Sequence, residues 1–238
     1  MKIAILEADH VADELRPTHG DYPTMFTRLL LTADSDIEFE TFTVIDNQFP
    51  SHHDYDAFLI TGSKFSAYEQ EPWILALIEL IKDLHAKKKV MLGICFGHQL
   101  IAIALGGNTE KAQQGWGVGN YLSELLDTPE WMQTTPTDKQ FRLLVSHQDQ
   151  VVALPTDATL LGRNDFCPNA MYQIEDHVLT FQGHPEFSKS YSKALMDKRR
   201  EAIGEEVYQK GIDSLQLMPQ GELVAKWMYE FVAFANKK

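Results

Sequence analysis

The segment "VMLGICFGHQL", residues 90–100, places a cysteine between two glycines directly after a short apolar run. Such a run predicts a buried strand, and the following "HQLIAIALGG" predicts a short helix that ends at paired glycines. Strand, G-x-C-x-G and helix together form the sequence pattern of a nucleophile elbow. The chain must turn sharply at Cys95, and Gly93 and Gly97 supply the small residues that this close approach of strand and helix requires.

The N-terminal half alternates between short apolar runs and segments with helical spacing. Strands are predicted at residues 2–9, 37–45, 56–63 and 90–94. Helices are predicted at residues 23–31, 72–89 and 98–107. Alternation of strand and helix predicts an α/β fold with a central, mostly parallel sheet that helices cover on both faces.

The pattern changes after Gly107. Residues 109–126 and 141–155 alternate between apolar and polar side chains and predict more exposed, partly antiparallel strands. The remaining predicted elements are an apolar strand and two helices, at residues 178–188, 188–204 and 221–237. Proline and threonine predict a flexible loop at residues 128–138. Because no repeat or long linker interrupts the pattern, residues 1–238 are expected to form a single domain.

The charge balance limits the classes of partner. The 238 residues include 21 Lys and Arg against 34 Asp and Glu, a formal net charge of −13 at pH 7. Such a surface repels phosphate backbones, so we expect no direct nucleic-acid binding. The basic cluster at residues 87–89 is explained by its place at a helix end, where cations offset the negative end of the helix dipole.

Other features indicate an intracellular protein without cofactors. No apolar stretch is long enough to span a bilayer, and "MKIAILEAD" lacks the pattern of a secretory leader. Two distant cysteines, Cys95 and Cys167, do not make a disulfide framework, and Cys167 before Pro168 is interpreted as an incidental thiol. We therefore expect a cytoplasmic enzyme or binding protein without metal. The motif "SHHD", with His52 and His53, has no companion cluster at ligand spacing and favours a solvated loop.

Cys95 is the candidate nucleophile. At the start of the following helix, its sulfur would lie in the positive potential of unpaired amide N–H groups, which favours the thiolate. The amide of Phe96 would point towards whatever the sulfur attacks and could donate a hydrogen bond to an oxyanion. The alternative is a buried cysteine in a tight turn, and the short motif alone does not exclude it.

The segment "QGHPEFS" supplies a candidate base and its partner. His184 lies at the end of an apolar strand, and Glu186 follows at i+2, on the same side of an extended segment. The carboxylate could bind one ring nitrogen and leave the other for Cys95, as a nucleophile–base–orienter triad requires. The order Cys, His, Glu excludes an α/β-hydrolase, in which the acid precedes the histidine.

The motifs "GICFGHQ" and "GHPE", with "LITGS" and "LLVSHQDQVVALP", resemble those of the class I (triad) glutamine amidotransferase family. The resemblance covers nearly the whole chain and implies a flavodoxin-like fold. It implies that Cys95 attacks a γ-glutamyl carboxamide, that His184 transfers protons and that Glu186 orients the ring. Ammonia leaves, and water then hydrolyses the thioester to glutamate.

The resemblance also assigns the residues around this triad. The backbone amides of Gly62 and Phe96 would form the oxyanion hole, and Gln99 would hold the amino-acid end of the substrate with main-chain groups of Ser146 and Gln148. His147 would shape the pocket, or only cap its loop, and Gln99 could instead face solvent. Gln148 stands where many relatives have glycine, and a positive φ there would strain it.

Three functions remain open from the sequence. The first is a glutamine amide hydrolase that delivers ammonia to a synthetase. Because the chain has no P-loop or other nucleotide fingerprint, such a synthetase would be a partner in trans. The second is a self-sufficient γ-glutamyl peptide hydrolase with the same triad, and several segments resemble the plant γ-glutamyl peptidases. The third is a catalytically idle regulatory protein, which an intact triad disfavours. The loops at residues 16–26 and 64–73 are candidates for selecting the leaving group.

Overall fold

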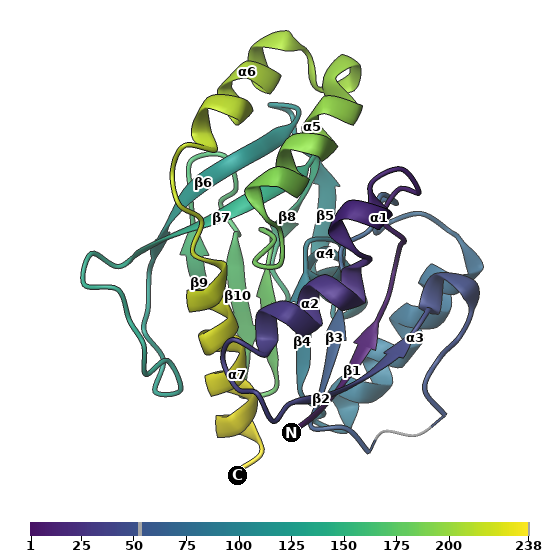
Figure 1. Cartoon of the computed structure of the whole chain (residues 1–238). Coiled ribbons are helices and arrows are strands. Elements are labelled where there is room, and N and C mark those ends of the chain that lie inside the picture. Colours follow the sequence, from purple (N-terminus) through teal and green to yellow (C-terminus); the bar gives the residue numbers. More distant parts are fainter. Residues whose placement is uncertain (52–53, 238) are drawn as a thin grey trace.

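A nine-stranded mixed β-sheet forms the middle layer of the molecule, in the order β2-β1-β3-β4-β11-β10-β9-β6-β7 (Figure 1). The computed structural model describes residues 1–51 and 54–237. The strands of this sheet are β1 Lys2–Leu6, β2 Glu38–Phe42, β3 Ala57–Ile60, β4 Met91–Ile94, β6 Gly117–Leu125, β7 Gln140–His147, β9 Ala158–Arg163, β10 Met171–Ile174 and β11 Val178–Phe181. Two further strands, β5 Asn108–Lys111 and β8 Asp149–Ala153, form a separate antiparallel pair.

Helices cover the sheet on both faces. They are α1 Arg16–His19, α2 Tyr22–Leu30, α3 Pro72–Ala86, α4 Phe96–Ala104, α5 Lys189–Ile203, α6 Glu205–Ser214 and α7 Gly221–Ala235, with a 3₁₀ turn, η1, at Val44–Asp46. In Figure 1, α2 and α7 lie together in front of the sheet, whereas α4 lies behind it.

The parallel half of the sheet determines where a site can form. Strands β2, β1, β3, β4 and β11 run parallel to one another. This order corresponds to the 2-1-3-4-5 order of flavodoxin-like folds, in which ligands bind at the carboxyl ends of the strands. The carboxyl ends of β3, β4 and β11 are adjacent, so residues that follow these three strands meet at one edge.

Alternating side chains build two hydrophobic layers from the same strands. Ile3 and Ile5 of β1 point into the layer beneath α2 and α7, where Phe26 and Trp227 are fully buried. Ala4 and Leu6 of the same strand point into the opposite layer beneath α3 and α4. Period-two alternation sends successive residues of β1 to opposite faces, and all four side chains are buried because helices cover both.

The antiparallel half carries its own helical cover. Strands β10, β9, β6 and β7 are antiparallel to their neighbours. Helices α5 and α6 pack over β6, and Val118, Met196 and Tyr208 form a small buried cluster there. Helices α5 and α6 form the upper part of the molecule in Figure 1.

The predicted α/β, flavodoxin-like architecture is confirmed. Each predicted helix is present, and the segments after Gly107 are antiparallel as their alternation indicated. The predicted strand at 178–188 is too long, because β11 ends at Phe181 and His184 forms only an isolated bridge with Leu144. The sequence did not predict α1, α6, β9 or β10. Helix α1 and strand β10 have only four residues each, and α6 buries only two side-chain positions.

The predicted loop at residues 128–138 contains no helix or strand, but its middle is attached to the core. Trp131 is buried, and its Nε1 donates to the side-chain oxygen of Gln173 at 2.8 Å. The carbonyl of Thr134 accepts a hydrogen bond from the Trp227 indole of α7 at 2.6 Å. The loop therefore contributes a large side chain to the hydrophobic layer beneath α7.

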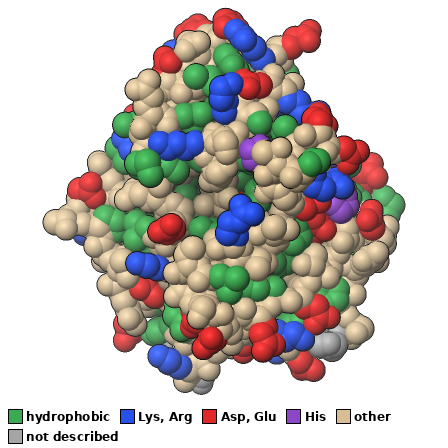
Figure 2. Space-filling model, viewed as in Figure 1, with side chains coloured by type: hydrophobic (Ala, Val, Ile, Leu, Met, Phe, Trp, Pro, Cys, Tyr) green, Lys and Arg blue, Asp and Glu red, His purple; other side chains and the backbone are tan. Residues whose placement is uncertain are grey.

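The described part of the chain has no helix that is both long and apolar enough to cross a membrane. The face shown in Figure 2 carries acidic and basic side chains next to one another, with hydrophobic side chains between them.

We expect Gly97→Ala to lower the free energy of unfolding by about 3 kcal/mol, the upper end of the usual cost of overpacking. A Cβ at Gly97 would lie 2.5 Å from the carbonyl oxygen of Ile60, which cannot move unless β3 shifts. Urea unfolding measures the loss. Gly106→Ala is the control, because its Cβ would meet nothing within 4 Å and adds only strain at φ 91°, about 1–2 kcal/mol. Equal losses would contradict this account of the packing.

Candidate active site

Cys95 occupies a strained turn between β4 and α4. Its backbone has φ 51° and ψ −98°, a conformation that residues other than glycine rarely adopt. The turn is tight because a Cβ at Gly93 would lie 2.9 Å from the backbone of Gly97. Strain of this kind persists only where the surrounding structure enforces it, as at functional turns. The geometry is that of the elbow that the sequence predicts.

Helix α4 points its amino end at the cysteine. The first hydrogen bond of the helix runs from the Gln99 amide to the Cys95 carbonyl, at 3.0 Å. The amides of Phe96, Gly97 and His98 therefore have no acceptor within the helix. Their dipoles create positive potential near the sulfur, which stabilises negative charge there.

His184 and Glu186 lie beside this elbow because β11 is the neighbour of β4. His184 follows the end of β11, and its amide donates to the Leu144 carbonyl at 2.8 Å. Its Nδ1 lies 2.6 Å from Oε1 of Glu186, and both side chains are almost fully buried. The ring of Phe187 stacks on the imidazole with centroids 3.8 Å apart and planes at 10°. The hydrogen bond and the stacked ring fix the orientation of the imidazole.

The charge state of His184 follows from its neighbours. Burial alone would lower the pKa of His184, because the charged ring loses its hydration. The negative charges of Glu186 and Cys95, with hydrogen bonds to both, outweigh burial and raise this pKa to about 10. The imidazole is therefore protonated at neutral pH. A protonated ring next to Cys95 favours the anionic form of the sulfur.

Gly62 lies directly against both Cys95 and His184. A Cβ at this position would lie 2.7 Å from Cε1 of His184 and 3.7 Å from Cβ of Cys95. Only glycine fits beside the imidazole here without displacing it. Among the described residues, no hydrogen bond engages the Gly62 amide, and the Phe96 amide is free at the start of α4. The two donors predicted for an oxyanion hole thus remain available.

Cys95 opens into a cavity of about 200 Å³, which also holds four of the residues predicted to bind substrate: Gln99, Ser146, His147 and Gln148. These residues come from α4 and from the junction of β7 and β8. The same cavity is lined by three cationic side chains and one anionic side chain: Lys64, Lys111, Arg199 and Asp149. In a chain with a net charge of −13, this local excess of positive charge favours an anionic ligand.

Hydrogen bonds fix the orientation of the polar groups in this cavity. Gln99 Nε2 donates to the carbonyl of Asp149 at 2.8 Å. Nδ1 of His147 lies 3.0 Å from the same carbonyl, and burial lowers the pKa of His147 to about 4. Because a carbonyl only accepts, the neutral His147 ring carries its proton on Nδ1. The possible strain at Gln148 is absent, since its φ is not positive.

Two residues that line or approach this site were not predicted. Arg199 of α5 is half-buried; its Nη1 donates to Oγ of Ser146 at 2.9 Å, and its guanidinium lies 5.5 Å from the centre of the Trp116 ring. Gln182 is buried, with Nε2 3.5 Å from Sγ of Cys95. No pattern in the sequence indicated Arg199, because α5 is distant in sequence from Cys95 and from Ser146. Gln182 shares the alternation of His184 and Glu186, which could have indicated it.

The other candidate residues lie elsewhere. His52 and His53 fall outside the described residues. Cys167 is buried and does not line the cavity of Cys95. Glu7, His10 and Asp21 form the one group in the described part of the chain that could hold a metal ion. Arg16 already lies 3.2 Å from the carboxylate of Asp21 and partly neutralises the group, so we assign no metal there.

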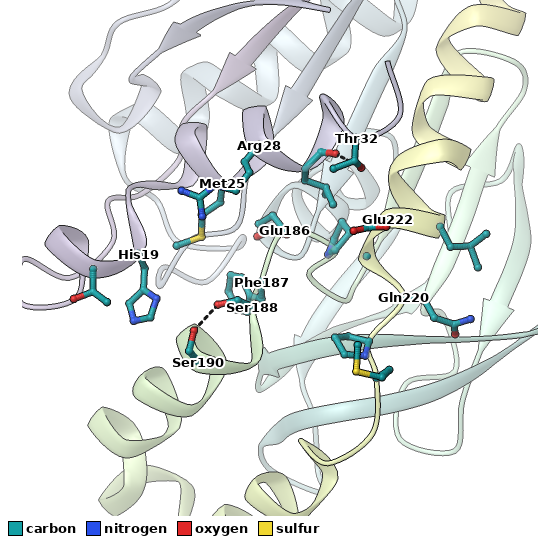
Figure 3. Close-up of a pocket in the computed structure, with 17 residues that line it drawn as sticks. His19, Met25, Arg28, Thr32, Glu186, Phe187, Ser188, Ser190, Gln220 and Glu222 are labelled. Atoms are coloured by element: carbon teal, nitrogen blue, oxygen red, sulfur yellow. Dashed lines mark hydrogen bonds between the residues drawn. The ribbon is translucent and has the colours of Figure 1, made fainter. Parts of the chain in front are cut away.

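A larger cavity, about 750 Å³, contains neither Cys95 nor His184 and shares no lining residue with the smaller one. Helices α1 and α2, the segment after β11 and the start of α7 surround it, as Figure 3 shows for His19, Met25, Arg28, Glu186, Phe187, Ser188 and Glu222. It borders the triad only at Glu186. Of the three residues, only Cys95 lines the smaller cavity, and Glu186 lines the larger one.

Comparison with known sequences gives matches over most of the chain. The family model for glutamine amidotransferase class-I matches residues 22–200. Gamma-glutamyl peptidase 2 of Arabidopsis thaliana is 30% identical over 224 residues, covering 90% of this chain and 88% of the plant protein. Gamma-glutamyl peptidase 4 of the same plant is 36% identical over 189 residues, covering 77% of this chain and 74% of that protein.

Solved structures show the same fold. A glutamine amidotransferase from Thermotoga maritima superposes with a TM-score of 0.75 at 18% identity, covering 98% of this chain and 96% of the other. A glutamine amidotransferase from Methylobacillus flagellatus gives 0.74 at 20% identity, covering 100% and 94%. The matching family model and the relatives at 30–36% identity lead to one conclusion. The chain belongs to the class-I glutamine amidotransferase family.

Proposed function

We propose that this protein is a cysteine-dependent hydrolase of γ-glutamyl amide bonds. One observation carries the proposal: Cys95 stands in a strained elbow next to the imidazole of His184, whose Nδ1 lies 2.6 Å from Glu186. A nucleophile, a base and an orienting acid in this relation can perform acyl transfer. Membership of the family supports a γ-glutamyl carbonyl as the group attacked.

The reaction proceeds in two halves. In the first, the anionic sulfur of Cys95 forms a bond to the γ-carbonyl carbon, and the oxyanion accepts hydrogen bonds from the Gly62 and Phe96 amides. The protonated His184 gives its proton to the leaving nitrogen, the C–N bond breaks and a γ-glutamyl thioester remains. In the second half His184 takes a proton from water, hydroxide adds to the carbonyl and the C–S bond breaks to release glutamate.

The cavity supplies groups for the amino-acid end of the substrate. Both N–H groups of the Gln99 amide are engaged, with Asp149 and Gln182, so its oxygen is free to accept from an α-ammonium group. Arg199 donates to Ser146 through Nη1 and keeps other donors for a carboxylate. Main-chain groups of Ser146 and Gln148 and the ring of His147 complete the proposed glutamyl site.

Two leaving groups fit this chemistry. We favour the amine of a γ-glutamyl peptide, because the γ-glutamyl peptidases of Arabidopsis thaliana match 77–90% of the chain. Ammonia from glutamine is the second candidate, because the family model is that of glutamine amidotransferases. In that case a synthetase would act as a partner in trans. Addition of that synthetase would raise the rate at which this protein hydrolyses glutamine.

Glutamate release from three substrates tests the proposal: glutamine, a γ-glutamyl dipeptide and the α-glutamyl dipeptide of the same composition. We expect release from the γ-linked dipeptide and none from the α-linked control, because only the γ-linkage leaves both the α-ammonium and the α-carboxylate free to bind. Faster turnover of glutamine than of the dipeptide would favour the second candidate. If neither glutamine nor the γ-glutamyl dipeptide, the two γ-linked compounds, releases glutamate, the proposed function is contradicted.

A further inference from the structure

Gln182 is a buried amide whose contact with the sulfur the triad does not explain. It follows β11 directly, is 1% exposed and points its Nε2 at Sγ of Cys95 from 3.5 Å. Its Oε1 accepts from Nε2 of Gln99 at 3.1 Å. The hydrolysis described above needs no amide side chain at this place. A buried amide must satisfy its polar groups, but a sulfur is a weak acceptor unless it carries charge.

The orientation of this amide is fixed by a chain of hydrogen bonds. The chain starts at the backbone carbonyl of Asp149, which can only accept, so the group of Gln99 that faces it must be the nitrogen. The second N–H of that nitrogen then requires an acceptor, so Gln182 presents its oxygen to Gln99. The nitrogen of Gln182 is left to face Cys95. One carbonyl therefore determines that a donor, and not an acceptor, faces the sulfur.

We propose that Gln182 is a positioning residue that donates a hydrogen bond to the anionic sulfur of Cys95 and holds it ready for attack. This inference rests on the proposed function, in which Cys95 is the nucleophile. A hydrogen bond to a charged acceptor is stronger than one to a neutral acceptor, and burial increases the difference. The donor stabilises the thiolate relative to the thiol, and it adds a second fixed contact beside the imidazole of His184.

The titratable groups around the sulfur allow a clean test between pH 5 and pH 9. The pKa of His184 is raised to about 10 by its negative neighbours despite burial. Burial lowers the pKa of His147 to about 4 and that of His98 to about 3, and it raises the pKa of Cys167 to about 12. The remaining charged groups that face the sulfur or line its cavity are Lys64, Lys111, Asp149, Glu186 and Arg199. None of the four shifted groups has its midpoint within this window.

The rate of alkylation by iodoacetamide reports how much of the Cys95 sulfur is in the thiolate form, and its measurement requires no substrate. The thiolate forms a C–S bond with the methylene carbon, and iodide leaves. We measure the alkylation rate against pH by mass spectrometry of the Cys95 peptide, for the parent and for Gln182→Met, which keeps the length of the side chain and removes the donor. We expect the midpoint of the profile to rise by about one pH unit in the variant, with about tenfold slower alkylation below the midpoint.

Two further variants separate positioning from folding. Gln99→Met removes the bond that orients Gln182 without touching the sulfur, and we expect its midpoint to rise by a smaller amount. Gln173→Met, whose side chain bonds Trp131 away from the cavity, is the matched control and should leave the midpoint unchanged. Urea unfolding of each variant identifies any that fail to fold.

A folded Gln182→Met with the parent midpoint would overturn the inference, and so would a Gln99→Met that moves the midpoint downwards. If Gln182→Met does not fold, Gln99→Met decides the question. An upward shift of its alkylation midpoint supports the proposed chain of hydrogen bonds from Gln99 through Gln182 to the sulfur, and an unchanged midpoint overturns the inference. These results do not depend on glutamate release. If neither γ-linked compound is hydrolysed, the proposed function fails while the alkylation profile still decides the role of Gln182.

Discussion

Cys95→Ala should reduce hydrolysis of the preferred γ-glutamyl substrate by about 10⁴-fold or more, because the variant cannot form the thioester. Residual turnover would come from binding and the oxyanion donors alone. Initial rates of glutamate release at saturating substrate measure the loss. The replacement removes only the sulfur from a residue 5% exposed, so the fold should persist. Its urea unfolding curve checks this.

Cys167→Ala is the matched control for that variant. Cys167 is also a buried free cysteine, 2% exposed, but burial raises its pKa to about 12 and it lies outside the cavity of Cys95. We expect its rate to stay within about twofold of the parent, since its side chain does not line the cavity into which Cys95 opens. Equal activity of the two alanine variants would remove Cys95 from the mechanism.

Glu186→Gln should lower kcat at pH 7 by about 10²–10⁴-fold, the usual contribution of general acid–base catalysis, because the imidazole loses the carboxylate that orients it. The replacement keeps the shape of a side chain that lies 2.6 Å from Nδ1 of His184. Burial lowers the pKa of His184 and the carboxylate raises it, so removal of the carboxylate must lower this pKa from about 10. The alkaline limb of kcat/KM should therefore move to lower pH.

The pH–rate profiles of parent and variant between pH 6 and pH 10.5 measure both effects. Glu222→Gln provides a control with the same chemical change, because Glu222 is exposed and borders the same large cavity without contacting the imidazole. Its profile should match that of the parent. An alkaline limb that does not move in Glu186→Gln would show that the carboxylate does not set the charge of His184.

The parallel half of the fold was readable from the sequence because its strands are buried on both faces. Runs such as "VMLGI" must be covered on two sides, and the helical segments between them supply the cover. β9, β10 and α6 were not readable. β10 is four residues long and contains half-buried Gln173, and α6 buries only Tyr208 and Gly211. Elements that bury so few residues are defined by their tertiary neighbours and not by an apolar period.

The proximity of Cys95, His184 and Glu186 could be predicted because the three residues lie in compact motifs. The strain at Cys95 follows from two glycines, and the pairing of His184 with Glu186 follows from alternation along an extended segment. Arg199 was not readable, because only the packing of α5 against β7 brings it to Ser146. The contact of Gln182 with the sulfur depends on a carbonyl in β8 that sequence alone cannot place.

Acid quench during turnover, followed by mass spectrometry of the peptides, tests the covalent step most directly. The protein is mixed with a γ-glutamyl substrate, and the reaction is stopped within the first turnovers. We predict a γ-glutamyl group on the peptide that contains Cys95, none on the peptide that contains Cys167, and none on either in Cys95→Ala. Glutamate release with Cys95 unmodified, or with the γ-glutamyl group on another residue, would contradict the mechanism.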